Sequence, residues 1–248
     1  MERAEWLKKM RAQTEALYDR FAPIYWVRFG VCAGETHRQN IGKFLERLGA
    51  RSSVLDAGCG AGLYDAMLLQ PGHNVLGIDQ SGKMLARARE IYPLERFPKL
   101  RYEKVGLQEM DFQAEFDGAT CVDAMEHIPP EDWPGILDRF QKALKPGGPF
   151  YITIDATPKE ESQESYEKSI ALGLPVVFGE VADKIDAYYP RVMAMDSEEF
   201  IGELGDQAVY HYHPPLEQVR LWLNQAGLEI EEEGTGDGYF HFLARKKV

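Results

Sequence analysis

The stretch Val54-Leu55-Asp56-Ala57-Gly58-Cys59-Gly60-Ala61-Gly62 decides the fold of this chain of 248 residues. It reads as an apolar strand that ends in an acid, followed by three glycines at alternate positions and then a helix. A ligand can lie against such a turn because glycine has no side chain. A carboxylate beside a phosphate costs electrostatic energy, so the acid before the glycines suits an ammonium group better than a pyrophosphate. We therefore expect a ligand that is cationic at this end.

A second strand, Val75-Leu76-Gly77-Ile78-Asp79, also ends in an acid. From that position a carboxylate can bind both hydroxyls of a ribose. A dinucleotide fingerprint would need its third glycine at position 63, where this chain has leucine, which argues against an NAD-dependent oxidoreductase. Two acids and a glycine turn predict an amino-acid nucleoside as the ligand.

From about residue 51, short apolar runs alternate with helical stretches, as in βαβ units on a parallel sheet. Helices are expected after Gly60, Ser81 and Glu131. The last two strands are joined by a glycine-rich turn, so we expect them to pair antiparallel. The predicted strands are Ser53–Asp56, Asn74–Asp79, Leu100–Lys104, Ala119–Asp123, Phe150–Asp155, Leu228–Glu233 and Tyr239–Arg245.

Two segments fall outside this alternation. Residues 1–50 have apolar side chains at loosely helical spacing and predict a helical flap at one end of the sheet. Residues 156–209, which are rich in acids, proline and tyrosine, predict an inserted lid. We thus expect one domain, residues 1–248, with its core in 51–155 and 210–248.

Three later motifs, together with the glycine turn, carry a resemblance to a known family. They are Phe116-Asp117-Gly118-Ala119-Thr120-Cys121, Glu126-His127-Ile128-Pro129 and Leu144-Lys145-Pro146-Gly147-Gly148. Over residues 51–155 and 210–248 the chain resembles the class I S-adenosylmethionine-dependent methyltransferases of small molecules. The resemblance implies an α/β fold with a doubly wound, mostly parallel seven-stranded sheet whose last strand is antiparallel, and S-adenosylmethionine as the methyl donor.

The resemblance also implies a donor site, residue by residue. The family often has an acid after the third strand to meet the adenine amino group; here Gln108 or Glu109 could take that place. Met84 could equally fill the core. The expected donor-binding residues are Asp56, Gly58, Cys59 and Gly60 at the methionine end, Asp79 at the ribose, Gln80, Met84, Gly106 and Leu107 around the adenine, and Asp123 and Ala124 at the transferring methyl group.

Methyl transfer needs alignment of acceptor and donor and removal of a proton, so few residues need to take part in the reaction itself. His127 is the first candidate base because it follows the fourth strand, where an open sheet presents its ligand crevice; it could instead cap the loop. His211 and His213 alternate along an extended segment and are further candidates, or part of a strand that closes the lid. Tyr18 resembles the tyrosine that closes over the donor in small-molecule methyltransferases.

The acceptor site is expected to be aromatic. Tyr18 and Tyr25 lie on one helix face if the helix continues through Pro23. Tyr25, together with Phe178, Tyr188 and Tyr189 from the lid, could form an apolar pocket around a small acceptor, or a homodimer interface.

A divalent metal is the alternative to a metal-free site. Asp123, Glu126 and His127, with the later His213, could hold a cation. This layout resembles the small-RNA 3′-end 2′-O-methyltransferases and the ubiquinone-pathway O-methyltransferases.

Charge and hydropathy limit the partners. The formal net charge of −12 disfavours nucleic acids and anionic membranes. The sequence has neither an apolar run long enough to span a bilayer nor an N-terminal signal peptide, so a cytoplasmic location and no membrane partner are expected. Our main prediction is methyl transfer to a small organic acceptor, first at oxygen, then at nitrogen or carbon. The alternatives are a metal-assisted methyltransferase on an RNA 3′ end or a quinone precursor, and a non-catalytic nucleoside-binding protein.

Overall fold

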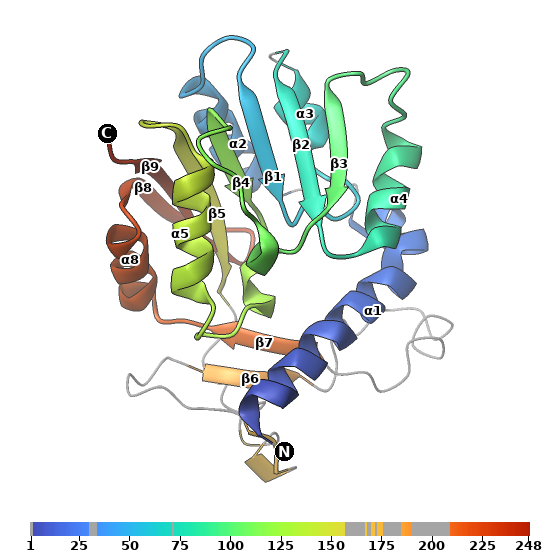
Figure 1. The fold of residues 1–248 in the computed structure, drawn as a ribbon, viewed down its shortest axis with the longest axis vertical. Coiled ribbons are helices and arrows are strands. Elements are labelled where there is room, and N and C mark those ends of the chain that lie inside the picture. The colour runs from blue at the N-terminus through green and yellow to red at the C-terminus, as the bar shows by residue number, and fades with distance from the viewer. Residues whose placement is uncertain are drawn as a thin grey trace.

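The computed structural model describes residues 2–29, 34–70, 72–156, 167, 170–171, 173–175, 185–189 and 209–248; for 185–189 it describes the backbone. Seven strands form one sheet in the order β3-β2-β1-β4-β5-β9-β8 (Figure 1). The first five strands are parallel, whereas β9 runs antiparallel to β5, and β8 to β9. The strands are β1 Ser53–Ala57, β2 Asn74–Asp79, β3 Leu100–Lys104, β4 Gly118–Cys121, β5 Pro149–Asp155, β8 Leu228–Gly236 and β9 Tyr239–Lys246. The predicted fold class is confirmed.

Helices cover both faces of the sheet, with α5 and α8 on one face and α2 and α3 on the other (Figure 1). Successive residues of a strand point to opposite faces, so Val54 and Leu55 are both fully buried, in different hydrophobic clusters. The helices are α1 Arg3–Phe29, α2 Glu35–Glu46, α3 Asp65–Leu69, α4 Gly82–Ile91, α5 Trp133–Ala143 and α8 Leu216–Gln225, with 3₁₀ turns η1 Leu107–Glu109 and η2 Met125–His127.

Helix α1 crosses the carboxyl ends of the parallel strands (Figure 1). It continues through Pro23, so Tyr18 and Tyr25 lie on the same side of it, toward the sheet. Trp6, Leu17 and Phe21 are buried and hold the helix against the rest of the protein.

A second, two-stranded sheet lies beside α1 (Figure 1). Strand β7, Val209–His213, pairs antiparallel with β6, Ile185–Tyr189, which the sequence analysis did not predict. In β7, Tyr210 and Tyr212 are buried in the core cluster that contains Trp133 and Trp222, and the two histidines alternate with them. Of the rest of the expected lid, the structure describes residues 156, 167, 170–171 and 173–175, and the other residues lie outside the described part. No helix among the described residues is long and apolar enough to cross a membrane.

Candidate active site

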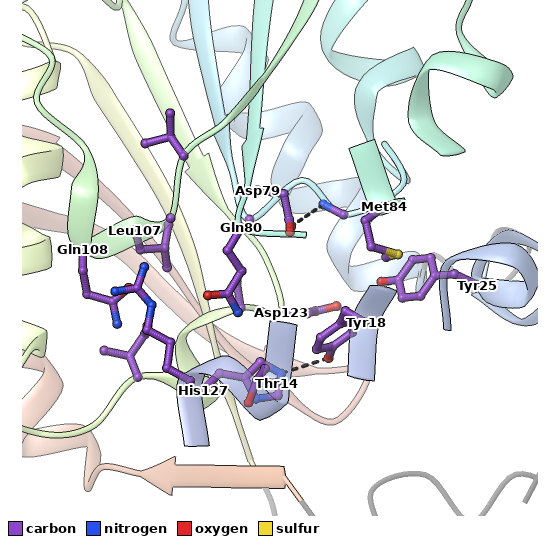
Figure 2. Close-up of a pocket in the computed structure, with 17 residues that line it drawn as sticks. Thr14, Tyr18, Tyr25, Asp79, Gln80, Met84, Leu107, Gln108, Asp123 and His127 are labelled. Atoms are coloured by element: carbon purple, nitrogen blue, oxygen red, sulfur yellow. Dashed lines mark hydrogen bonds between the residues drawn. The ribbon is translucent and has the colours of Figure 1, made fainter. Parts of the chain in front are cut away.

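A cavity lies between α1 and the carboxyl ends of β1, β2 and β4 (Figure 2). Its empty volume is about 710 Å³, counting the part that is open to solvent. Its lining residues are Arg11, Thr14, Tyr18, Tyr25, Gly58, Gly60, Asp79, Gln80, Met84, Val105, Gly106, Leu107, Gln108, Asp123, Ala124, His127 and Ile128. Nine of the residues predicted to bind the donor are among them.

The glycine loop forms the floor of the cavity. Gly58 and Gly60 have φ of 74° and 53°, a region that disfavours residues with a side chain. A Cβ on Gly58 would lie 2.6 Å from the Cβ of Ala124, and one on Gly60 would lie 3.1 Å from Cε of Met84. The loop is therefore packed directly against its neighbours and leaves backbone, not side chains, facing a ligand.

Asp79 fixes this loop from the end of β2 (Figure 2). One carboxylate oxygen accepts the Gly60 N–H at 2.9 Å, and the other accepts the Ser81 N–H at 2.7 Å. Burial raises its pKa to about 6, although these two hydrogen bonds act in the opposite direction. Each oxygen keeps a lone pair for a ligand hydroxyl. Helix α1 is attached nearby, because Asp19 accepts hydrogen bonds from the Ser81 hydroxyl and the Lys83 N–H.

Asp56 and Cys59 do not line the cavity, contrary to expectation. Asp56 is 3% exposed and accepts a 2.7 Å hydrogen bond from the Thr120 hydroxyl, behind the glycine loop. It also lies next to Asp65, which is fully buried and accepts a hydrogen bond from Tyr102. Burial raises the pKa of Asp56 to about 6. The acid that the sequence assigned to an ammonium group thus belongs to a buried carboxyl pair.

Asp123 is the carboxylate that does reach the cavity at this end (Figure 2). It lies two residues beyond the end of β4 and has φ of 51°, which turns the chain out of the strand. Thr153 holds it on both sides, since its hydroxyl accepts the Asp123 N–H and donates to Oδ1, both at 2.8 Å.

Tyr18 and His127 form a hydrogen-bonded pair across the cavity, 2.9 Å between Oη and Nε2 (Figure 2). Nδ1 of His127 lies 3.3 Å from the carbonyl oxygen of Tyr210, to which it can only donate. Nε2 is then the acceptor of the Tyr18 proton. Burial lowers the pKa of His127 to about 4, and burial together with the Glu126 charge raises that of Tyr18. The pair is a neutral imidazole bonded to a neutral phenol at pH 7.

The two other predicted histidines lie behind His127. The ring of His211 is 4.9 Å from that of His127, and the ring of His213 is 5.6 Å from that of His211. Asp155, His211 and His213 each offer one ligand atom, and these atoms all lie within 4.8 Å of one another. This set shares only His213 with the metal ligands expected from the sequence.

Of the two residues expected to meet the adenine amino group, Gln108 and not Glu109 lines the cavity. Glu109 forms an ion pair with Arg11 instead. Arg11 and Thr14 were missed by the sequence analysis, although the spacing of Arg11, Thr14, Tyr18 and Tyr25 is that of one helix face.

A second cavity adjoins the first and shares Tyr18, Tyr25 and Asp123 with it. It lies between α1, α2 and the β8–β9 turn, and aromatic rings dominate its wall. Its other lining residues are Phe29, Gly34, His37, Leu63, Tyr64, Glu126, Asp237 and Tyr239. Of the predicted acceptor-binding residues, Tyr25 lines both cavities, Tyr188 and Tyr189 lie in β6 with only their backbone described, and Phe178 lies outside the described residues.

Comparisons with known proteins agree with this geometry. The family model "Methyltransferase domain" matches residues 54–148. The ubiquinone biosynthesis O-methyltransferase of Acinetobacter baylyi is 32% identical over 66% of this chain and 69% of its own. Among solved structures, a SAM-dependent methyltransferase of Methanosarcina mazei has a TM-score of 0.64 at 18% identity, covering 83% of this chain and 97% of its own. A Burkholderia thailandensis 1,6-didemethyltoxoflavin-N1-methyltransferase with bound S-adenosylhomocysteine has a TM-score of 0.62 at 19% identity, covering 100% and 92%.

The strand order and the glycine loop define a Rossmann-like fold with a cavity at the carboxyl ends of its strands. Together with the curated relatives, they show that the chain belongs to the class I S-adenosylmethionine-dependent methyltransferases. The protein is an enzyme, and S-adenosylmethionine is its methyl donor, as the sequence predicted. The residues present fit such a donor, because the cavity combines a side-chain-free floor, a carboxylate at the end of β2 and apolar walls.

Proposed function

We propose that the enzyme methylates a hydroxyl group of a small organic acceptor. The observation that carries this proposal is the Tyr18–His127 pair, a proton acceptor on the cavity wall. Oxygen is favoured as the acceptor atom because the curated relatives are named O-methyltransferases. Bound S-adenosylmethionine supplies the methyl group.

The donor is proposed to bind with its ribose at Asp79 and its adenine between Met84 and Leu107. Its methionine end would lie over Gly58, beside Asp123. Carboxylates at both ends give this pocket a preference for ligand hydroxyl and ammonium groups. The remaining predicted contacts that line the cavity are Gly60, Gln80, Gly106 and Ala124.

Proton removal would use Tyr18 first and then His127. The acceptor hydroxyl donates to Oη of Tyr18, and as its proton moves there, the Tyr18 proton passes to Nε2 of His127. His127 starts neutral, so Nε2 is free to take the proton. Asp155 would stabilise the imidazolium that forms, since its charge raises the pKa of His127.

The acceptor is proposed to occupy the second cavity, which meets the first at Tyr18, Tyr25 and Asp123. Its aromatic wall, with Tyr64 and Tyr239, suits a flat molecule, and Asp123 and Glu126 in the same wall suit one that carries polar groups.

A radiometric assay with methyl-labelled S-adenosylmethionine tests the proposal. Phenols and catechols are offered in one panel and aromatic amines in another. Tyr18→Phe should lower kcat by about 10²-fold or more with little change in donor affinity, because it breaks the proton path. Tyr92→Phe, a buried tyrosine outside both cavities, is the matched control. Turnover confined to amines, or an unchanged kcat in Tyr18→Phe, would contradict the proposal. Donor binding without turnover on any acceptor would instead favour the alternative of a non-catalytic nucleoside-binding protein.

Metal-assisted transfer, to an RNA 3′ end or a quinone precursor, is a second candidate because Asp155, His211 and His213 lie together. Two histidines and a carboxylate are common ligands of divalent transition metals. Burial keeps His211 neutral by lowering its pKa, as metal binding requires. Activity and metal content should be measured after dialysis against a chelator; activity that survives in metal-free enzyme rejects this candidate.

Several expectations remain predictions: the division into flap, core and lid, the cytoplasmic location, the absence of nucleic-acid partners and a homodimer. Analytical ultracentrifugation tests the last of these directly.

A further inference from the structure

The cavity has two carboxylates at its strand ends, Asp79 and Asp123. Asp79 already holds the glycine loop, and Asp56 lies behind it. Among the described residues, Asp123 is therefore the carboxylate that can meet a cation over the glycine loop. How well Asp123 can bind such a cation depends on the residues that fix the direction of its side chain.

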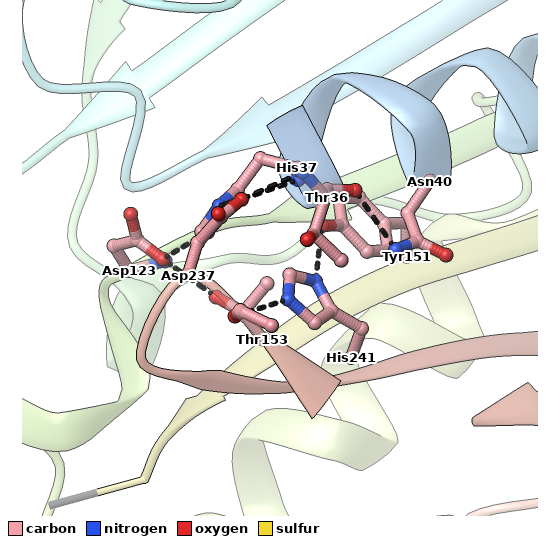
Figure 3. A network of polar contacts seen from close by, with 9 residues as sticks. Thr36, His37, Asn40, Asp123, Tyr151, Thr153, Asp237 and His241 are labelled. Atoms are coloured by element: carbon pink, nitrogen blue, oxygen red, sulfur yellow. Dashed lines mark hydrogen bonds and ion pairs between the residues drawn. The ribbon is translucent and has the colours of Figure 1, made fainter. Parts of the chain in front are cut away.

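His37, from the first turn of α2, holds Asp123 from outside the cavity (Figure 3). Its Nε2 lies 3.1 Å from Oδ1 of Asp123, and its Nδ1 lies 3.2 Å from Oδ2 of Asp237. Carboxylates accept hydrogen bonds and donate none, so both ring nitrogens must donate. His37 is then an imidazolium between two anions. A neutral ring has one N–H and could donate to only one of the two carboxylates.

The surroundings of His37 favour this charged form. The side chain is 3% exposed, and its burial lowers the pKa; the hydrogen bonds to Asp123 and Asp237 outweigh that effect and raise it. The ring stacks on that of Tyr64, with 5.9 Å between the ring centroids, and this aromatic face suits a cation. The ring of Tyr239 lies 5.1 Å away in a T-shaped contact.

His241, whose ring is 4.8 Å from that of His37, stays neutral, because burial lowers its pKa. It is fixed by the Tyr151 hydroxyl on one side and the Gly236 carbonyl on the other (Figure 3).

Oδ1 of Asp123 is fully used by this arrangement. It accepts from the Thr153 hydroxyl and from Nε2 of His37. In the part of the chain that the structure describes, Oδ2 of Asp123 accepts no hydrogen bond, and the residue lines the cavity. Two donors on one oxygen fix the carboxylate plane and leave the other oxygen for a ligand.

We propose that His37 is a positioning residue for the methyl donor, and that it aims Oδ2 of Asp123 at the ammonium group of the donor's methionine end. This inference rests on the donor placement given under the proposed function. Asp237, in the turn between β8 and β9, completes the device. Its Oδ2 also accepts the N–H groups of Thr36 and His37, so it fixes the start of α2 as well as the ring.

Calorimetry with two ligands tests the inference. S-adenosylhomocysteine carries the amino-acid end, whereas 5′-methylthioadenosine has the same adenosine thioether without it. His37→Phe should weaken S-adenosylhomocysteine by about tenfold, because a charge-assisted contact loses its alignment, and should leave 5′-methylthioadenosine unchanged. His37→Gln should recover part of the loss, since its amide can still donate to Asp123.

Three controls separate positioning from general damage. Asp123→Asn should show the same ligand-selective loss, and adding His37→Phe to it should cost nothing further. Asp237→Asn should give a smaller loss of the same kind. His73→Gln removes a buried imidazole that accepts the Ser52 N–H at the opposite end of the sheet, and should change neither affinity.

Equal weakening of both ligands in His37→Phe, or additive effects of His37→Phe and Asp123→Asn, would overturn the inference. Wild-type protein that binds 5′-methylthioadenosine as tightly as S-adenosylhomocysteine would instead refute the donor placement on which it rests. Near-ultraviolet circular dichroism of each variant verifies that the fold is intact, and the Asp123 and Asp237 variants keep the test decisive if His37→Phe does not fold.

Discussion

Replacing Gly58 by alanine should destabilise the enzyme more than the same change at any glycine that only needs a positive φ. At φ 74° a side chain costs about 1–2 kcal/mol in backbone strain. The new Cβ would also lie 2.6 Å from the Cβ of Ala124, and relieving such an overlap costs about 1–3 kcal/mol more. We therefore expect a loss of roughly 2–5 kcal/mol in the free energy of unfolding, measured with urea.

Gly147 provides the matched control. Its φ is 76°, but the nearest atom to an added Cβ is Cγ2 of Val248 at 3.8 Å, an ordinary contact. Gly147→Ala should lose only the strain, about 1–2 kcal/mol, and keep its affinity for S-adenosylhomocysteine. Gly58→Ala should lose affinity as well, because relief of the overlap moves the loop or Ala124. Equal losses of stability in the two variants would refute the claim that the loop is pressed against Ala124.

Three further predictions concern the acids and the histidine of the site. Asp79→Asn should weaken S-adenosylhomocysteine by about tenfold or more in calorimetry, since each charge-assisted hydrogen bond to the ribose contributes about 1.5–3 kcal/mol; unchanged affinity in a folded variant would refute the ribose placement. Because the pKa of Asp56 is raised to about 6 from 3.8, its contribution to stability is present below pH 4 and is lost as the pH rises through 6. Urea titrations from pH 4 to 7 should show this loss in wild type and a smaller one in Asp56→Asn; equal slopes would contradict it. Since the pKa of His127 is lowered to about 4, the pH profile of kcat should have no inflection near pH 6.5. An inflection there that disappears in His127→Gln would contradict this prediction.

The centre of the sheet could be predicted from the sequence because β1, β4 and β5 are buried on both faces. The bounds of β2 and β3 agree with the prediction. In β2 an apolar run ends at turn residues, which indicates a strand. In β3, an edge strand, only Leu100 is buried, so its prediction depended on the alternation of strands and helices. The cavity followed from the same pattern. Parallel strands present their carboxyl ends at one edge, so the residues after β1, β2 and β4 had to meet there.

The hydrogen-bond partners of the site residues could not be predicted, because they come from segments that are distant in the sequence. Nothing in the spacing of His37 and Asp237 relates the start of α2 to the turn between β8 and β9. Strand β6 was missed because its partner β7 is separated from it by a segment without a periodic pattern. The unbroken course of α1 through Pro23 likewise depends on packing, since residues on both sides of the proline are held against the sheet and α4.

The burial of Asp56 explains how three acids can lie near one edge of the cavity. Asp79 ends β2, Asp56 is the last but one residue of β1, and Asp123 follows β4, so three carboxyl groups lie near one edge of three adjacent strands. The strand in the middle is the one whose loop folds back, because the N–H groups of Gly58 and Cys59 both donate to the Ile78 carbonyl of β2. That fold covers Asp56, and burial favours its neutral form by raising its pKa. In the proposed donor placement, the two outer carboxylates act at opposite ends of the ligand, one toward hydroxyls and one toward a cation. The glycine loop therefore does more than admit the donor: it keeps the central carboxyl group out of the cavity that the other two line.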